Sequence, residues 1–173
     1  STPSYLGRSL PFPDALNSIL PADDVSVGVR FVNVGGQRNE HRGEASPAVE
    51  VPVAISAEAS TSFSNKAEAE HVVHILKSLI GGCKNAASVP ESIGIITPYS
   101  AQVSLINTML DDPELVDLLK FAPTTIEVKS VDAYQGRERD IIIFSAVRSN
   151  RVGQIGFLSD WRRMNVAMTR AKS

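Results

Sequence analysis

Two stretches of this chain are apolar at consecutive positions, and they restrict the possible folds more than any other feature. Residues 93–96 read Ile-Gly-Ile-Ile, and residues 140–147 read Asp-Ile-Ile-Ile-Phe-Ser-Ala-Val. A short strand that is apolar throughout is typical of a parallel sheet whose two faces are both covered. Segments with the helical spacing of apolar residues alternate with these strands. The pattern therefore predicts an α/β fold, with a mostly parallel sheet and helices on both faces.

The remaining elements follow from periodicity and from capping signals. Asn65 and Glu68 have the spacing of a capping box before a helix over residues 66–80, and a Gly-Gly pair follows as the stop. Further helices are expected over 100–110, 114–120 and 161–170, and further strands over 27–34 and 126–131. Residues 35–61 are rich in turn formers and lack periodicity, which predicts a long loop inserted outside the core.

Charge is distributed unevenly along the 173 residues, a length that suits one domain. Residues 1–125 hold eight Lys and Arg against fourteen Asp and Glu, whereas residues 126–173 hold nine against five. An anionic ligand is therefore expected at the C-terminal third. The single cysteine excludes an intrachain disulfide and favours an intracellular compartment, either nucleus or cytoplasm. No run of about 18 apolar residues occurs, so no membrane partner is expected.

Polar segments follow three of the predicted strands, at the edge where parallel sheets bind ligands. They read TPYSAQ after residue 96, SVDAYQGRE after residue 129 and RSN after residue 147. A fourth dense segment covers residues 156–172. On a helix Arg163 and Arg170, seven residues apart, would share a face and point at one anion.

These segments together resemble the motifs of superfamily 1 helicases, in the up-frameshift and senataxin-like branch. The resemblance is strongest in IGIITPYSAQ, SVDAYQGRERDIIIFSAVRS and GFLSDWRRMNVAMTRAK, which occur in the family's order. It implies that residues 1–173 form the second, C-terminal RecA-like motor domain, a three-layer sandwich from a longer chain. In such helicases ATP with Mg²⁺ binds in the cleft between two RecA-like domains, and single-stranded RNA or DNA lies across both. No G-x-x-x-x-G-K-[ST] stretch occurs, so the phosphate loop and the Mg²⁺ ligands are expected on the first motor domain of the parent.

The resemblance also assigns roles to individual residues. It implies two catalytic residues, Arg170, which resembles the arginine finger, and Gln135. It implies that Gly136 lies at the phosphates, Glu138 at the ribose and Arg163 beside the finger. The nucleic-acid contacts that it implies do not read base sequence, and they are Thr97, Pro98, Tyr99, Ser130 and Arg148. No metal ligand is assigned in this chain.

Simpler interpretations stay open for several of these residues. Glu138 and Arg139 could form an ion pair at the entry to a strand, and Thr97 could serve turn chemistry. Tyr99 and Tyr134 either stack on bases or pack in the interior.

The implied function is that of half a helicase motor, which supplies the arginine finger, part of the ATP cleft and part of the single-strand track. Such a fragment is expected to be inactive in ATP hydrolysis by itself. The alternative is a helicase-derived module that binds nucleic acid or protein without catalysis. RNA and DNA are not distinguished, because contacts to the backbone are common to both.

Overall fold

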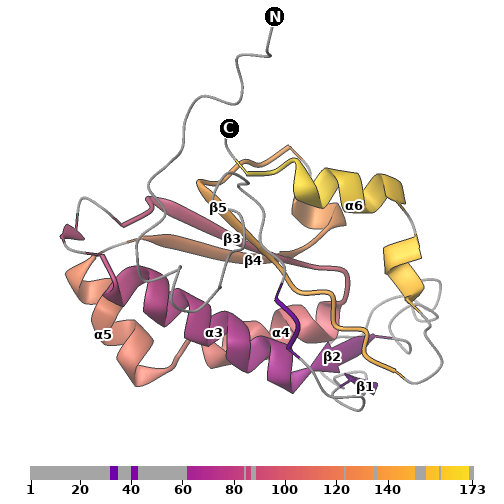
Figure 1. Ribbon diagram of the computed structural model, residues 1–173, viewed down its shortest axis with the longest axis horizontal. Helices are drawn as coiled ribbons and strands as arrows, with labels where there is room; N and C mark the ends of the chain where they lie inside the picture. Colours follow the sequence, from indigo (N-terminus) through magenta and orange to yellow (C-terminus); the bar gives the residue numbers. More distant parts are fainter. Residues whose placement is uncertain are drawn as a thin grey trace, which may run out of the picture.

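The computed structural model shows a parallel sheet of three strands in the order β4-β3-β5 (Figure 1). β3 (Ser92–Thr97) lies in the middle, between β4 (Thr125–Ser130) and β5 (Ile141–Phe144). The structure describes residues 32–34, 40–42, 62–83, 85–86, 89–122, 124–134, 136–150, 155–159 and 161–171. The apolar run in β3 is buried as predicted, because both of its faces are covered.

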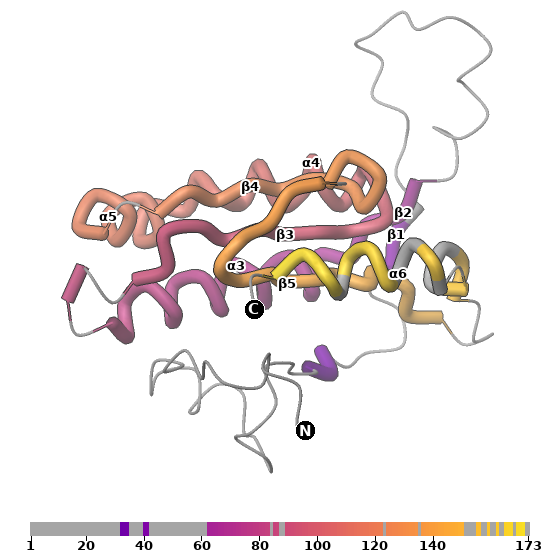
Figure 2. Tube along the Cα trace, turned by 90° about the horizontal axis from the view of Figure 1, so that it is seen from above, coloured from indigo at the N-terminus to yellow at the C-terminus, as the bar shows by residue number. Residues whose placement is uncertain are grey.

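Helices cover both faces of this sheet. α3 (Lys66–Gly81), α4 (Ser100–Met109) and α5 (Pro113–Phe121) lie on one face, and α6 (Trp161–Met168) lies on the other (Figures 1 and 2). The predicted α/β sandwich of the RecA-like type is therefore confirmed.

Side chains of β3 alternate between two hydrophobic cores. Ile93 and Ile95 join the larger core, which α3, α4 and α5 cover. Ile96 points the other way and packs with Tyr134 and Ala167, the latter on α6. Burial on both sides explains why residues 93–96, between Ser92 and Thr97, carry no polar side chain.

The start of α3 confirms the predicted cap. The Asn65 Oδ1 atom accepts a hydrogen bond from the Glu68 backbone N–H at 3.1 Å. The reciprocal half of a capping box is replaced, because the Asn65 N–H donates to Gln102 Oε1 at 2.8 Å. The helix ends at Gly81 as expected, although the capping residue Gly82 keeps a right-handed φ of −79°.

Two short strands form a second, separate sheet. β1 (Glu40–Arg42) pairs antiparallel with β2 (Phe63–Asn65). Residues 40–42 therefore form a strand inside the segment predicted as a loop, and most of residues 35–61 lies outside the described residues. The start of α3 already fixes β2, so residues 40–42 can pair with β2 although the surrounding segment is rich in turn-forming residues. The strand predicted over 27–34 also lies largely outside the described residues, and residues 32–34 have no regular structure.

Two elements end earlier than predicted. β5 stops at Phe144 rather than at residue 147, where Val147 takes a φ of +70° that leaves the strand conformation. α6 stops at Met168, and beyond it Ala171 forms a parallel bridge with Arg139. Arg170 thus lies outside the helix, so the argument that it shares a helical face with Arg163 is wrong. No helix among the described residues is long and apolar enough to cross a membrane.

Candidate functional site

Most of the sequence-predicted site residues that the structure describes lie at two opposite edges of the parallel sheet. Thr97 and Ser130 are register partners at the carboxyl ends of β3 and β4. At the amino end of β5, the Arg139 backbone N–H donates to the Arg170 carbonyl oxygen at 3.1 Å, next to Glu138. β3 has six residues, and at about 3.3 Å per residue its ends lie about 16 Å apart. We call these two regions the carboxyl edge and the amino edge.

The hydroxyls of the carboxyl edge differ in accessibility. Thr97 is completely buried, and its Oγ1 atom has no hydrogen-bond partner among the described residues. Ser130 is half-buried, and its Oγ atom accepts a hydrogen bond from the Ala133 N–H at 3.4 Å. Pro98 is half-buried between them and α4. Of the two hydroxyls, Ser130 is thus the one in reach of a ligand at this edge.

Arg148 lies in a closed cage rather than in solution. Its Nε atom donates to Glu40 Oε2 at 2.9 Å, and its guanidinium carbon lies 4.3 Å from the centre of the Phe63 ring. Tyr99 contacts the same ring edge-on, with the ring centres 5.5 Å apart. Burial lowers the pKa of Arg148, but hydrogen bonds to Tyr99 and Glu40 outweigh this effect. The pKa is therefore raised, and Arg148 stays positively charged.

A buried polar network holds the segment that follows β5. Glu68 Oε2 accepts from Ser145 Oγ at 2.7 Å and from the Val147 N–H at 2.9 Å. Asn65 Nδ2 donates to the Val147 carbonyl at 3.0 Å, and Gln102 Nε2 donates to Ser145 Oγ at 3.1 Å. These residues join α3 and α4 to the carboxyl edge.

Sequence reasoning missed this network and the cage. Glu68 and Asn65 were recognised only as a helix cap, and Glu40 and Gln102 were given no role. The one available signal was Gln102 itself, a polar residue at a position where a helix start should bury an apolar one. Glu40 gave no signal, because its partner Arg148 is 108 residues away.

The amino edge combines open backbone with a dense ion pair. Gly136 has a φ of +77°, and a side chain there would meet no atom within 4 Å. Glu127 pairs with both Arg137 and Arg139, at 2.5 and 2.6 Å. Glu138 is exposed and lends Arg139 only its backbone oxygen. The side chains of Glu138 and Arg139 therefore do not form an ion pair with each other.

Arg170 is half-buried and held by neutral partners. Its Nε atom donates to the Val166 carbonyl at 3.0 Å, and Nη2 donates to Thr169 Oγ1 at 3.2 Å. The backbone bond from Arg139 to Arg170 thus brings Arg170 beside Glu138 at the amino edge, and Gly136 lies two residues before Glu138 in the chain. Gln135 and the side chain of Arg163 lie outside the described part of the structure.

Tyr134 is a packed residue and not a base platform. Its side chain is completely buried on the α6 face of the sheet, and burial raises the pKa of its hydroxyl. The choice that the sequence left open is therefore decided for Tyr134. Tyr99 is only half-buried.

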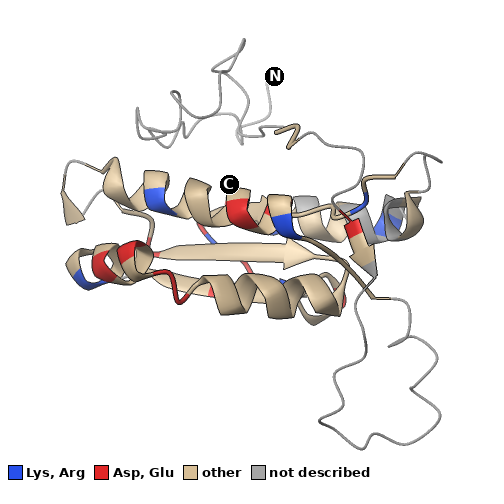
Figure 3. Cartoon of the chain, turned by 90° about the horizontal axis from the view of Figure 1, so that it is seen from below, with Lys and Arg blue, Asp and Glu red and all other residues tan. Residues whose placement is uncertain are grey.

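The arginines of the C-terminal third are spread over several segments. Arg137 and Arg139 lie between β4 and β5, Arg148 follows β5, α6 carries two arginines, and Arg170 follows α6. On the other face of the sheet, α4 carries no charged residue along its length, whereas α5 carries both signs (Figure 3). The positive charge that could attract an anionic ligand therefore lies at the sheet edges and on α6.

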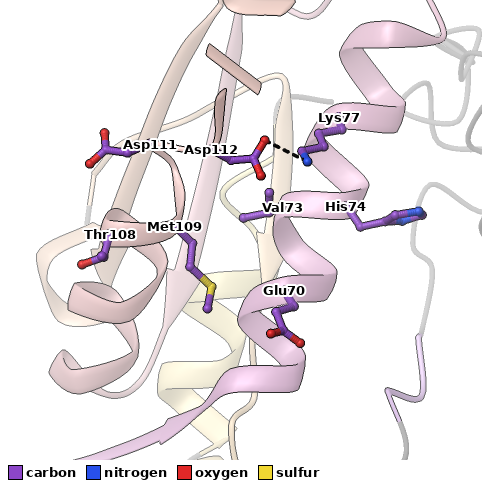
Figure 4. A pocket seen from close by; sticks show the side chains of 8 residues that line it. All are labelled: Glu70, Val73, His74, Lys77, Thr108, Met109, Asp111 and Asp112. Atoms are coloured by element: carbon purple, nitrogen blue, oxygen red, sulfur yellow. Dashed lines mark ion pairs between the residues drawn. The ribbon is translucent and has the colours of Figure 1, made fainter. Parts of the chain in front are cut away.

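A pocket of about 450 Å³ lies apart from both edges, between α3 and the turn from α4 to α5 (Figure 4). Lys77 enters it from α3 and forms an ion pair with Asp112 at 2.8 Å. The pKa of Asp112 is lowered by its hydrogen bond to Lys77. His74 also lines the pocket and stacks on His71, with ring centres 5.9 Å apart. None of the sequence-predicted site residues lines this pocket.

The chain matches a known domain family and several known proteins in sequence. Residues 17–173 match the model of the AAA domain family AAA_12. The regulator of nonsense transcripts 1 homologues of Drosophila melanogaster and Neurospora crassa are 50% and 47% identical over 113 residues. These matches cover 65% of this chain and 9% and 10% of the relatives. The DNA replication ATP-dependent helicase/nuclease DNA2 of Xenopus laevis is 40% identical over 121 residues, which are 69% of this chain and 10% of that protein.

The chain thus spans about a tenth of the length of the curated relatives that it matches. The family match covers most of the chain, including the three strands, the helices on both faces and both edges. The chain therefore belongs to the AAA domain family AAA_12, as a superfamily 1 helicase domain of the up-frameshift type.

Proposed function

We propose that this chain is the second, C-terminal RecA-like motor domain of an ATP-dependent RNA or DNA helicase. The observation that supports the proposal is where the structure places residues that the resemblance links to different ligands. Glu138 and Arg170 lie at the amino edge, and Ser130 and Tyr99 lie at the carboxyl edge, about 16 Å away. A motor needs this division, because the same domain must bind and respond to nucleotide at one end and move nucleic acid at the other.

The amino edge fits half of an ATP site. The open backbone at Gly136 lets phosphate oxygens approach, and the exposed Glu138 carboxylate can accept hydrogen bonds from ribose hydroxyls. Arg170 supplies a permanent positive charge. The Mg²⁺ ligands are assigned to the first motor domain of the parent on the motif resemblance alone. ATP with Mg²⁺ supplies the phosphoanhydride bond that is hydrolysed.

Arg170 acts as the arginine finger in this proposal. Its present partners, the Val166 carbonyl and Thr169 Oγ1, are uncharged. Closure of the two domains lets the guanidinium exchange them for the charge that develops on the γ-phosphate. The interaction is stronger in the transition state than in the ground state, so it accelerates hydrolysis. Gln135 is assigned beside it on the motif resemblance alone.

The carboxyl edge forms part of the single-strand track. Ser130 offers a hydroxyl and Tyr99 a half-buried ring, next to the N-terminus of α4. Ser62 Oγ accepts from the Ala101 N–H at 2.8 Å and thereby fixes this helix start. Contacts of this kind hold the backbone and are the same for any base sequence.

We infer an intracellular protein, because the relatives are named helicases and regulators of transcripts.

The test is single-turnover ATP hydrolysis by the full-length parent with Arg170→Ala. We expect hydrolysis to fall by about 10³-fold or more, with single-strand binding in the absence of nucleotide retained. Arg170→Lys should restore little, because a point charge cannot replace the planar guanidinium. The matched control is Arg162→Ala, an exposed arginine on α6. Near-normal hydrolysis by a folded Arg170→Ala parent would refute the finger, and a wild-type parent without hydrolysis would favour the non-catalytic module.

A further inference from the structure

We propose that Glu40 is a positioning residue for the single-strand track, and that it acts by fixing Arg148 in place. In this arrangement Arg148 shapes the carboxyl edge from inside and does not itself bind a phosphate. The inference rests on the proposed function, since it concerns how that edge binds a single strand.

One oxygen of Glu40 gathers three donors from consecutive residues. Glu40 Oε2 accepts from Arg148 Nε at 2.9 Å, from the Ser149 N–H at 2.8 Å and from Asn150 Nδ2 at 3.3 Å. The carboxylate thus holds both backbone and side chains of the segment after β5. Burial raises the pKa of Glu40, but the bonds from Ser149, Arg148 and Asn150 outweigh this, so the pKa is lowered and the group stays charged.

Glu40 itself is held by backbone pairing. It lies in β1, where its register partner is Asn65 in β2. Asn65 in turn caps α3 and bonds the Val147 carbonyl. The small sheet therefore connects the carboxylate to the large core through the pairing of β1 with β2 and through the start of α3, and it is a firm support.

The cage around Arg148 leaves little room for a phosphate. The side chain is 9% exposed and lies over the Phe63 ring. Gly156, with a φ of +52°, closes a further side, since a Cβ atom there would lie 2.6 Å from Arg148 Nη1 and 2.7 Å from Tyr99 Oη. An arginine that neutralises a nucleic-acid phosphate must reach solution, and this one is enclosed and already paired with the half-buried carboxylate of Glu40.

The backbone before Arg148 is also held in a strained conformation. Val147 is β-branched and has a φ of +70°, which such residues rarely adopt. Both of its backbone polar groups are bonded, the N–H to Glu68 and the carbonyl to Asn65. Glu68 and Asn65 thus fix the segment on one side of the turn and Glu40 on the other. Strain that is held from both sides is typical of a functional segment whose shape matters.

The experiment measures single-strand binding by the full-length parent without nucleotide, over a range of salt concentrations. The probes are a uniform RNA and a uniform DNA oligonucleotide of about 20 nucleotides. The variants are Glu40→Ala, Glu40→Gln, Arg148→Ala, Arg148→Lys and the double alanine variant. The control is Glu127→Ala, which breaks a comparable ion pair at the opposite edge.

We expect Glu40→Ala and Arg148→Ala to weaken binding by a similar factor, about tenfold, and the double variant to be no weaker. The slope of log affinity against log salt should stay as in the wild type, because no phosphate contact is lost. Glu40→Gln should lie between wild type and Glu40→Ala, because its amide oxygen still accepts a bond. Glu127→Ala should bind like the wild type. Gln and Lys variants keep the test valid where an alanine variant does not fold.

Three results would overturn the proposal. In the first, Arg148→Ala lowers the salt slope by about 0.7, the value of one single-strand phosphate, while Glu40→Ala binds as tightly as the wild type or tighter. Arg148 would then bind phosphate, with Glu40 as its competitor. In the second, the folded variants all bind like the wild type. In the third, the two single losses add in the double variant. A wild-type parent that binds neither probe would instead refute the proposed function.

Discussion

Gly94 is the residue at which one side chain decides whether the sheet can form. It lies in β3, directly over the ring of Tyr134. A Cβ atom at this position would lie 2.0 Å from Tyr134 Oη and 2.8 Å from Ile142 Cδ1. Both neighbours belong to the core on the α6 side, so neither can swing into solvent. The glycine is needed because an aromatic ring approaches the strand backbone.

We therefore expect Gly94→Ala to lower the free energy of unfolding by about 3 kcal/mol, measured by urea denaturation. The matched control is Gly81→Ala at the end of α3, where the nearest atom is Leu118 Cδ2 at an ordinary 3.5 Å. Alanine there should be neutral or stabilising. Equal losses at the two positions would contradict the packing of Tyr134 against β3.

Glu40 gives the molecule a defined response to acid. Its pKa is lowered from 4.5 by the hydrogen bonds that outweigh its burial. A carboxyl group whose pKa is lower in the folded than in the unfolded state contributes its full stabilisation of the fold at pH values above the unfolded-state pKa. This contribution is lost as the pH falls through the folded-state pKa. From about pH 6 to about pH 3, the wild type should therefore lose more stability than Glu40→Gln, as thermal melting would measure. Parallel melting curves for the two proteins would show that the carboxylate is not bonded in this way.

At the scale of elements, α3 and α5 start with different kinds of cap. Asn65 caps α3 and is 2% exposed, with its amide nitrogen donating to the Val147 carbonyl and to Glu68 Oε1. Asp112 caps α5 through the Leu115 N–H and pairs with Lys77 near the surface. The first site needs an acceptor and a donor, whereas the second needs only an acceptor.

Exchanging the two residue types tests this difference. Asn65→Asp keeps the cap but buries a charge beside a carbonyl and a carboxylate, so it should cost about 2 kcal/mol or more. Asp112→Asn keeps its cap in a wet site, so its thermal midpoint should change much less. Circular dichroism melting of both variants at neutral pH is sufficient. If Asn65→Asp melts at the same temperature as the wild type, the network around Val147 is not formed.

Local signals predicted the elements, and distant pairings escaped them. The helix over 66–80 followed from the spacing of Asn65 and Glu68, and β3 followed from an unbroken apolar run, since each is decided by neighbours in the chain. The contact between Glu40 and Arg148 joins residues 108 apart, and no periodicity records it. The helix after residue 161 was predicted two residues too long, because Ala171 leaves the helical path to form an isolated parallel bridge with Arg139.

The same distinction applies to the candidate site. The motif resemblance selected Glu138 and Arg170, and the amino edge brings these two together through the backbone bond from Arg139 to Arg170. It also selected Thr97 and Arg148, whose burial could not be inferred from residue type. A threonine and an arginine after a strand are ordinarily exposed, and only the packing of β1 and the loop before α6 encloses the arginine.

At the scale of the whole molecule, the proposed function gives each edge of the sheet a separate task. The central strand β3 is buried on both faces and runs from one edge to the other, so a displacement of one edge should be transmitted to the other through close-packed side chains. Direct effects of a substitution should nevertheless stay at their own edge. Binding measurements with one ligand at a time isolate these direct effects from the coupling between edges.

Two surface substitutions in the full-length parent test this separation. Glu138→Ala, at the amino edge, should weaken ATP binding several-fold in the absence of nucleic acid, because hydrogen bonds to the ribose are lost. Its affinity for a single strand without nucleotide should equal that of the wild type.

Ser130→Ala, at the carboxyl edge, should weaken single-strand binding by about two- to tenfold, the value of one hydrogen bond. Its affinity for ATP without nucleic acid should be unchanged. Both variants should hydrolyse ATP more slowly when a single strand is present at limiting concentration, because hydrolysis then needs both ligands. If either substitution alters binding of the ligand at the other edge, the two edges are not independent sites, and the assignment of ATP and nucleic acid to opposite ends of the sheet fails.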